Sequence, residues 1–308
     1  MNREIFGIWL CKPGTISMPY IYEVCLATWQ VMNPTFKVVL YTDNPKFCFN
    51  LLSRDTTEVR IIEDEFPGLI TEAQNIITDK TPEGMRFAQR SDYIRYTILR
   101  DRGGIYVDTD LLCYSSIEEL VDNSNASVMM AYEYTNRICN AFMARLTDMG
   151  KTYFEDLLEN YRKYYVKTSY TFNSIKYLYL LNRKHRDIVQ VLPLQEGMFF
   201  PNWEDGPNGD LSMLFQEECP LRGYGIHLYN TNPKWREARD KLDLEFMDDK
   251  HPSWLCRHLK DCVEKYIDLM VNAETRDLLK DKVLVPILGK LYGEQYLEQF
   301  RKDENNGT

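Results

Sequence analysis

The chain has 308 residues, of which 44% are hydrophobic, enough to bury the core of one large domain or of two modest ones. Its 37 Lys and Arg stand against 46 Asp and Glu, for a formal charge of -9. We expect no nucleic-acid partner, because binding to a phosphate backbone depends on basic groups. Small phosphorylated ligands remain compatible with this charge if carboxylates hold a divalent metal.

The eight cysteines include no CxxC pair and lie mostly in apolar segments, as expected of buried thiols in a reducing compartment. The amino-terminal residues lack the basic start and the cleavage site of a secretory signal, and they are interpreted as a strand. The sequence has no run of about 18 uncharged apolar residues, so we expect no transmembrane helix. These features predict a cytoplasmic protein that is soluble or at most peripherally attached to a membrane.

Strands and helices are predicted to alternate in the first part of the chain. Ile5–Leu10 is apolar and predicts a buried strand, after which Ser17 is placed to cap a helix that has Pro19 in its first turn. Lys37–Thr42 predicts a second strand, ending at an Asp-Asn-Pro turn. A short helix and the strand Val59–Ile62 should follow.

The same alternation continues to the centre of the chain. Met85–Asp101 has a helical pattern, Gly103 and Gly104 interrupt it, and Ile105–Asp108 resumes a strand. Repeated strand–helix units predict a doubly wound, mainly parallel α/β sheet. Open sheets of this kind bind ligands at the carboxyl ends of their strands.

The remaining segments divide into two regions. Short strands are expected at Ser127–Ala131 and Asn140–Met143, and helices at Lys151–Tyr165 and Ser174–Leu181. From Ser253 onward an apolar stripe at helical spacing, and further helical pattern over Leu278–Phe300, indicate a helical extension. We therefore divide the chain into a catalytic domain, 1–236, and a carboxy-terminal helical extension, 237–308.

Two carboxylates carry the main chemical signal. Asp108 and Asp110 are two apart at the end of the predicted strand, so in an extended segment their side chains point the same way. Such a pair can hold one hard cation, Mn²⁺ or Mg²⁺. Asp92 and Arg95 are three apart on the preceding helix, hence neighbours on its surface. The glycine pair can fold that helix back beside the strand, bringing all four side chains together.

The segment Ser91–Asp110 fits the pattern SDxxRYxxLxxxGGxYxDxD. It resembles the signature of glycosyltransferases with the GT-A fold and a DXD motif. The chain looks most like the branch that contains capsular-polysaccharide sugar transferases and the fungal initiating α-1,6-mannosyltransferase, with clostridial toxin glucosyltransferases as more distant relatives. This resemblance implies a GT-A type doubly wound mixed sheet with a Rossmann-like nucleotide-binding core.

The resemblance also implies roles for individual residues. Asp110 ligates the metal, and Asp108 contacts the donor ribose and reaches the metal directly or through water. Asp92 and Arg95 bind hydroxyls of the donor sugar, and all four count as catalytic. Trp9 matches an aromatic that stacks on the nucleotide base in the toxin branch, with core packing as the alternative for a Trp in an apolar strand.

The third metal ligand has more than one candidate. His227 falls where many family members place a residue that contacts the metal or the diphosphate. The segment HLYNTNPKW departs from the family pattern by separating His and Trp, so Asn230 or Asn232 could supply an oxygen ligand instead. A structural His227, bonded to the backbone, is a further alternative.

These assignments predict transfer of a sugar from a UDP- or GDP-linked donor to a glycan or lipid-linked glycan acceptor. The resemblance implies that the anomeric configuration is retained. Surface polysaccharide (capsule) biosynthesis is the favoured setting. A toxin-like enzyme that modifies a protein is the alternative. Two other classes are a dehalogenase-type phosphatase, which lacks its usual DxDxT continuation here, and a non-catalytic sugar-binding module.

A zinc site made from His251, Cys256, His258 and Cys262 is a further reading of the sequence. Their spacing is not that of a zinc finger, and Cys262 lies on the predicted helical core stripe. A buried thiol beside histidines that serve no metal is therefore favoured.

Overall fold

The structure is a computed structural model that describes residues 2–49, 57–134, 137–169, 172–193, 197–199, 223–228, 257, 258 and 262. Asn230 and Asn232 lie outside the described residues. So does the predicted carboxy-terminal extension, apart from residues 257, 258 and 262, which are helical. No helix within the described ranges is long and apolar enough to cross a bilayer.

A central sheet of seven strands has the order β3-β2-β1-β4-β7-β6-β8. Its strands are β1 (Glu4–Trp9), β2 (Lys37–Thr42), β3 (Thr57–Ile61), β4 (Gly104–Val107), β6 (Val128–Tyr134), β7 (Arg137–Arg145) and β8 (Val189–Leu192). β3, β2, β1 and β4 pair in parallel, and β7 is antiparallel to both β4 and β6. The mixed, mostly parallel α/β sheet confirms the predicted fold class.

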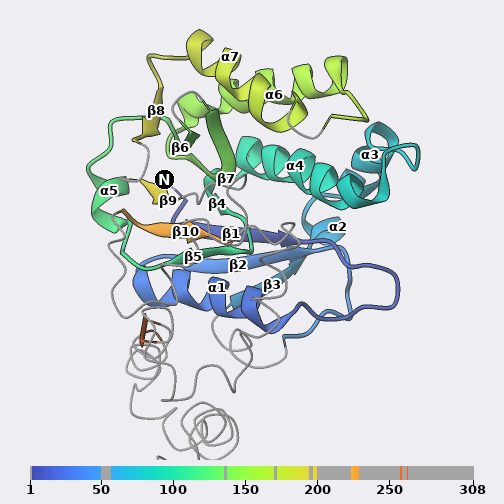
Figure 1. The fold of residues 1–308 in the computed structure, drawn as a ribbon, viewed down its shortest axis with the longest axis horizontal. Coiled ribbons are helices and arrows are strands. Elements are labelled where there is room, and N and C mark those ends of the chain that lie inside the picture. The colour runs from blue at the N-terminus through green and yellow to red at the C-terminus, as the bar shows by residue number, and fades with distance from the viewer. Residues whose placement is uncertain are drawn as a thin grey trace, which may run out of the picture.

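Helices cover both faces of this sheet (Figure 1). They are α1 (Tyr20–Met32), α2 (Ile62–Glu65), α3 (Leu69–Ile76), α4 (Glu83–Asp101), α5 (Glu118–Asp122), α6 (Lys151–Tyr164) and α7 (Tyr177–Lys184), with a π-helical turn at Phe172–Lys176 before α7. Alternate residues of the strands therefore enter two cores. In β1, Ile5 packs with α1, whereas Phe6 packs with α4.

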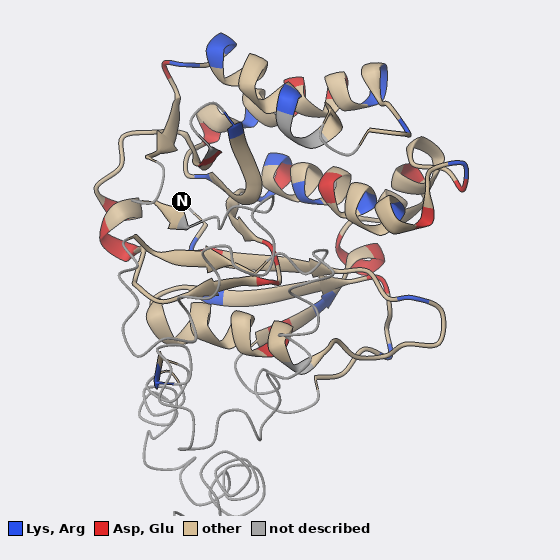
Figure 2. Cartoon of the chain, viewed as in Figure 1, with Lys and Arg blue, Asp and Glu red and all other residues tan. Residues whose placement is uncertain are grey.

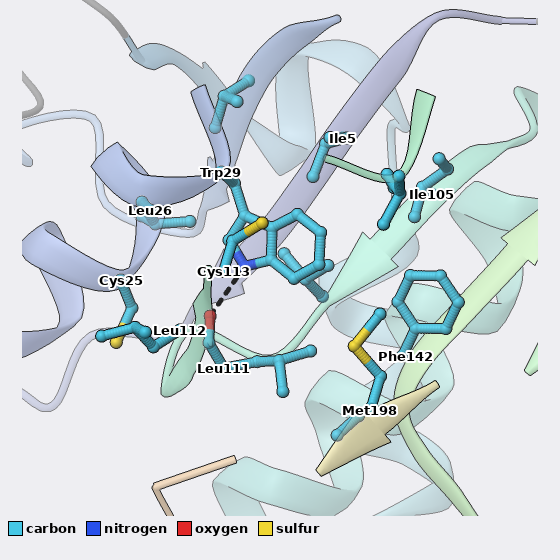
Figure 3. Close-up of a cluster of buried hydrophobic side chains, with 14 of the residues drawn as sticks. Ile5, Cys25, Leu26, Trp29, Ile105, Leu111, Leu112, Cys113, Phe142 and Met198 are labelled. Carbon is cyan, nitrogen blue, oxygen red and sulfur yellow. Dashed lines mark hydrogen bonds between the residues drawn. The ribbon is translucent and has the colours of Figure 1, made fainter. Parts of the chain in front are cut away.

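A second, three-stranded sheet has the order β5-β10-β9, formed by β5 (Leu111–Cys113), β10 (Gly225–His227) and β9 (Met198–Phe199). The indole of Trp29, buried on α1, donates a hydrogen bond of 2.7 Å from Nε1 to the carbonyl of Leu111 (Figure 3). Because Leu111 follows Asp110 directly, this bond fixes the backbone just after the carboxylate pair.

The glycine pair makes the predicted break between α4 and β4. Gly103 and Gly104 have positive φ angles of 72° and 93°, which residues with a side chain rarely adopt. A Cβ on Gly104 would lie 2.8 Å from the carbonyl oxygen of Glu4 in the neighbouring strand. Only glycine allows this close approach, so the turn that returns the chain beside α4 is specified by sequence.

Several local expectations need correction. Ser17 does not cap α1, which begins after Pro19 without a side-chain cap. The helix expected at Ser174–Leu181 instead begins as a π-helical turn and continues to Lys184. The short helix expected between Pro45 and Val59 is absent up to residue 49, and the rest of that segment, 50–56, lies outside the described residues.

Candidate active site

Asp108, Asp110 and His227 meet beyond the carboxyl end of β4. Asp108 follows β4, Asp110 precedes β5, and His227 ends β10, which pairs with β5 so that His227 lies opposite Leu111. The backbone N–H of Leu228 donates to the carbonyl of Asp110 at 2.9 Å. The strand pairing therefore brings a histidine 117 residues away in sequence to the carboxylate pair.

The three side chains can offer one ligand atom each, all within 4.8 Å of one another. His227 Nε2 is 3.1 Å from Asp110 Oδ1 and 3.6 Å from Asp108 Oδ2. Burial lowers the pKa of His227, but the charges of Asp110 and Asp108 outweigh it and raise that pKa. Two carboxylate oxygens and an imidazole nitrogen suit a divalent cation such as Mn²⁺, so the residues present fit the metal that the resemblance implies.

Arg95 joins the helix α4 to this cluster. Its NH2 is 2.9 Å from Asp92 Oδ1 and its NH1 is 3.2 Å from Asp108 Oδ1. The guanidinium carbon lies 4.1 Å from the ring centroid of Tyr106. The predicted pairing of Asp92 with Arg95 is correct, but the pair is not on the helix surface, because the two residues are only 0% and 3% exposed.

Asp92 combines complete burial with incomplete hydrogen bonding. Its Oδ1 contacts Arg95 and accepts from Asn140, whereas its buried Oδ2 has no hydrogen-bond partner among the described residues. Burial raises the pKa of Asp92 to about 7, against the opposing charge of Arg95. Unsatisfied carboxylate oxygens are costly in a protein interior, which favours a role in binding a ligand hydroxyl.

Asn140 on β7 completes this network, and the sequence analysis gave it no role. Its side-chain Nδ2 lies 2.9 Å from Asp92 Oδ1 and 3.1 Å from the hydroxyl of Tyr96. Its backbone carbonyl accepts a hydrogen bond of 2.6 Å from Arg95. Both Asn140 and Tyr96 are buried. A polar residue between the apolar Cys139 and Ala141, in an expected core strand, was the available sequence signal.

The sequence of this region has recognisable relatives. Residues 24–127, which include Asp92, Arg95, Asp108 and Asp110, match the family described as "Glycosyltransferase sugar-binding region containing DXD motif". Over these residues the chain is similar to glycosyltransferases that contain a DXD motif. A search of curated protein sequences finds no match.

Three solved structures of glycosyltransferases are among those similar to this chain. PaToxG glycosyltransferase is 14% identical, with 60% of this chain and 69% of that chain covered and a TM-score of 0.45. Mouse xyloside xylosyltransferase 1 is 12% identical over 75% of this chain and 98% of its own, at a TM-score of 0.45. The galactosyltransferase LgtC is 11% identical over 89% and 99%, again at 0.45.

Glu133, near the end of β6, is a further acid that the sequence analysis did not single out. It is 7% exposed and lies at a register shift between β6 and β7, where bulges commonly redirect side chains. Its Oε2 is 3.9 Å from Arg137 Nε, and its charge helps to raise the pKa of His227. Glu133 and Asp92 thus place two buried acids around the cluster.

Trp9 lies at the end of β1, at the same edge of the sheet as Asp108. Its ring is partly buried and lies 4.9 Å from that of Tyr22, centroid to centroid, at 57°. Its Nε1 is buried with no hydrogen-bond partner within the described part of the chain. Trp9 is therefore placed at the border of the core, where one ring can serve both packing and ligand stacking.

The described residues do not support a zinc site made from His251, Cys256, His258 and Cys262. His258 Nε2 lies 3.0 Å from the carbonyl of Cys113, and Cys262 Sγ lies 3.5 Å from His258 Nε2. His251 and Cys256 are outside the described residues. Among described residues, Asp108, Asp110 and His227 are the one group of at least three potential ligands that could hold a metal.

Proposed function

We propose that this chain is a metal-dependent glycosyltransferase that moves a sugar from a nucleoside-diphosphate sugar to a glycan or lipid-linked glycan. The observation that carries the proposal is the convergence of Asp108, Asp110 and His227 beside the buried Asp92–Arg95 pair. A carboxylate and imidazole cluster suits a divalent cation, and the adjoining pair offers polar atoms to a sugar. Retention of configuration and a place in surface polysaccharide synthesis belong to the same proposal.

Asp108, Asp110 and His227 would hold Mn²⁺ or Mg²⁺. When bound, such a cation acts as a Lewis acid toward the diphosphate, on which negative charge grows as the anomeric C–O bond breaks. His227 serves as a ligand in its neutral form, which the site without metal disfavours because both carboxylates raise the pKa of His227.

The donor sugar is assigned to Asp92 and Arg95. Asp92 Oδ2 can accept from a sugar hydroxyl, while Arg95 and Asn140 hold Asp92 Oδ1 in place. Arg95 also contacts Asp108, so one guanidinium would couple the sugar subsite to the metal subsite. This arrangement orients the sugar before bond breaking, which is where rigid positioning contributes to rate.

The nucleotide base is assigned to Trp9. Its ring stands at the carboxyl end of β1, next to β4 in the sheet, where a base can stack while the diphosphate reaches Asp110. The sequence does not distinguish uracil from guanine as the base of the donor. The catalytic domain, 1–236, a separate extension, 237–308, and a cytoplasmic location are parts of this proposal.

The test is release of nucleoside diphosphate from a panel of nucleotide-sugars incubated with Mn²⁺. We expect one or two donors to be hydrolysed slowly without any acceptor, and the activity to disappear with chelator or in Asp110→Asn. Asp64→Asn, an exposed acid on α2, is the matched control and should retain full activity. Hydrolysis that persists in excess chelator, or in Asp110→Asn, would remove the metal from the proposal.

A further inference from the structure

The segment 160–186 has a composition unlike the rest of the chain. It contains seven Lys and Arg and not one Asp or Glu, although the whole chain is acidic with a charge of -9. The same segment has seven aromatic residues. Basic residues interleaved with Tyr and Phe are typical of protein surfaces that lie in the headgroup region of a membrane.

One exposed face of α7, with the residue just before the helix, carries basic, aromatic and apolar side chains. Lys176, Tyr179, Leu180 and Arg183 follow the spacing i, i+3, i+4, i+7 and are all exposed, whereas the opposite face packs Leu178 and Leu181 into the core. Tyr179 is 40% and Leu180 61% exposed. Two apolar side chains are thus held in solvent between two cations.

The end of α6 continues this face. Tyr164 is 46% exposed, its ring stacks on Tyr177 at 6.2 Å between centroids, and Lys163 Nζ lies 5.2 Å from the Tyr164 centroid. We call the exposed residues of these two helix faces and their connection the basic-aromatic platform: Lys163, Tyr164, Val166, Lys167, Lys176, Tyr179, Leu180 and Arg183. Figure 2 shows Lys and Arg along α6 and α7, the helices farthest from α1 in Figure 1.

The cations of the platform have no carboxylate partner in the part of the chain that the structure describes. Within the described residues, Lys163, Lys167, Lys176 and Arg183 form no ion pair with any carboxylate, whereas Lys184 pairs with Asp156 at 2.6 Å. Unpaired surface cations attract an anionic surface at a range of about one Debye length, roughly 8 Å at physiological salt. Each is worth about a fivefold gain in binding to a membrane rich in anionic lipid.

Hydrogen bonds hold the segment between the two helix faces of the platform and join it to α4. The Asn173 side chain bonds the backbone of Val166 at both N–H and carbonyl, at 2.9 and 2.8 Å. The hydroxyl of Tyr165 contacts the side chains of Thr81 and Gln89. Gln89 is three residues before Asp92 on α4, so the segment that connects the two helix faces of the platform contacts α4 about one helical turn from Asp92.

We propose that the basic-aromatic platform docks the enzyme on an anionic lipid bilayer, with the active-site edge beside the headgroups. Lipid-linked acceptors present their sugars at that level, so docking would bring acceptor and donor subsite together. The part of the inference that concerns the acceptor rests on the proposed function. The docking itself rests only on the exposed apolar and unpaired basic residues of the platform.

The test is cosedimentation of the whole protein with vesicles of equimolar phosphatidylcholine and phosphatidylserine, compared with pure phosphatidylcholine. We expect binding to the mixed vesicles only, lost at high salt. Lys167→Glu should weaken it by roughly 20-fold and Leu180→Ser by roughly fivefold. Lys151→Glu, at the start of α6, and Met149→Ser, two residues before that helix, change exposed residues far from the platform along α6. They are the matched controls and should bind as wild type.

Equal loss in the controls, or equal binding to both vesicle types, would overturn the docking proposal. The docking proposal would also be overturned if the protein bound no vesicles, or if the platform captured another protein and no vesicles. Donor hydrolysis by Lys167→Glu and Leu180→Ser should stay at the wild-type level, because neither residue belongs to the active site. The proposed function is tested separately, by donor hydrolysis in Asp110→Asn. Unchanged hydrolysis in that variant would contradict the proposed function and would leave the vesicle result unaffected.

Discussion

Arg95 on α4 is ion-paired with Asp108 at the end of β4, with 3.2 Å between NH1 and Oδ1. The second terminal nitrogen of the same guanidinium is 2.9 Å from Asp92, so one buried cation holds two carboxylates that belong to different elements. The planar group makes both contacts at once, which an ammonium cannot reproduce.

Replacing Arg95 with Lys should therefore uncouple the two carboxylates. We expect donor hydrolysis to fall at least tenfold and the free energy of unfolding to fall by about 1–3 kcal/mol, because one buried carboxylate loses its partner. Arg100→Lys, which alters an exposed pair with Asp101 on the same helix, is the control. Unchanged hydrolysis in Arg95→Lys, measured beside chemical unfolding, would leave the pair with a structural role only.

The raised pKa of Asp92 should appear as a pH dependence of stability. A buried carboxyl with a pKa of about 7, against about 4 when unfolded, binds its proton more tightly in the folded protein. Its favourable contribution is complete below pH 4 and is lost as the pH rises to about 7. Relative to wild type, Asp92→Asn should thus gain stability between pH 4 and 7.

Urea unfolding of both proteins in chelator measures that difference, with Asp101→Asn as a control for an exposed acid on α4. A difference that stays constant, or that shrinks as the pH rises, would show that Arg95 keeps Asp92 ionised throughout this range.

The sequence predicted the parts of the site that one continuous segment encodes. Asp92, Arg95, Asp108 and Asp110 lie within 19 residues, and helix periodicity, the glycine break and strand alternation together place them at one edge. His227 could be proposed only by resemblance, because its position depends on the pairing of two three-residue strands, β5 and β10. Strands that short carry too few residues to show a period.

Burial was the other property that sequence pattern did not reveal. A charged pair at i and i+3 normally marks a solvated helix face, and only tertiary packing of β7 and α6 against α4 encloses Asp92 and Arg95. Asn140 was missed for the same reason, since its role exists only through contacts with α4.

Gly104 should tolerate no side chain. Gly104→Ala combines a φ of 93 with a Cβ 2.8 Å from the Glu4 carbonyl, and we expect a loss of about 2–4 kcal/mol in the free energy of unfolding. Gly84→Ala, in the first turn of α4 with open space around it, should be neutral or stabilising. Thermal unfolding of the two variants compares them directly, and equal melting temperatures would refute the assigned strain.

Trp9 should report nucleotide binding. We expect nucleoside diphosphate to quench tryptophan fluorescence and Trp9→Ala to weaken binding by about 1–3 kcal/mol, the scale of base–aromatic stacking. Trp9→Phe keeps an aromatic face and should retain most of the affinity. A large fall in melting temperature with unchanged affinity in Trp9→Ala would assign the ring to the core, beside Tyr22.

The central claim is that Asp108, Asp110 and His227 hold a divalent cation that the reaction requires. Mn²⁺ should raise the melting temperature of the wild type, since a ligand that binds only the folded state stabilises it. Asp110→Asn should gain nothing from Mn²⁺, because a neutral amide replaces one of the charged carboxylate ligands. Melting curves of both proteins across a Mn²⁺ titration measure this directly. An equal rise in both would contradict the assigned site, whereas a rise confined to the wild type is the predicted result.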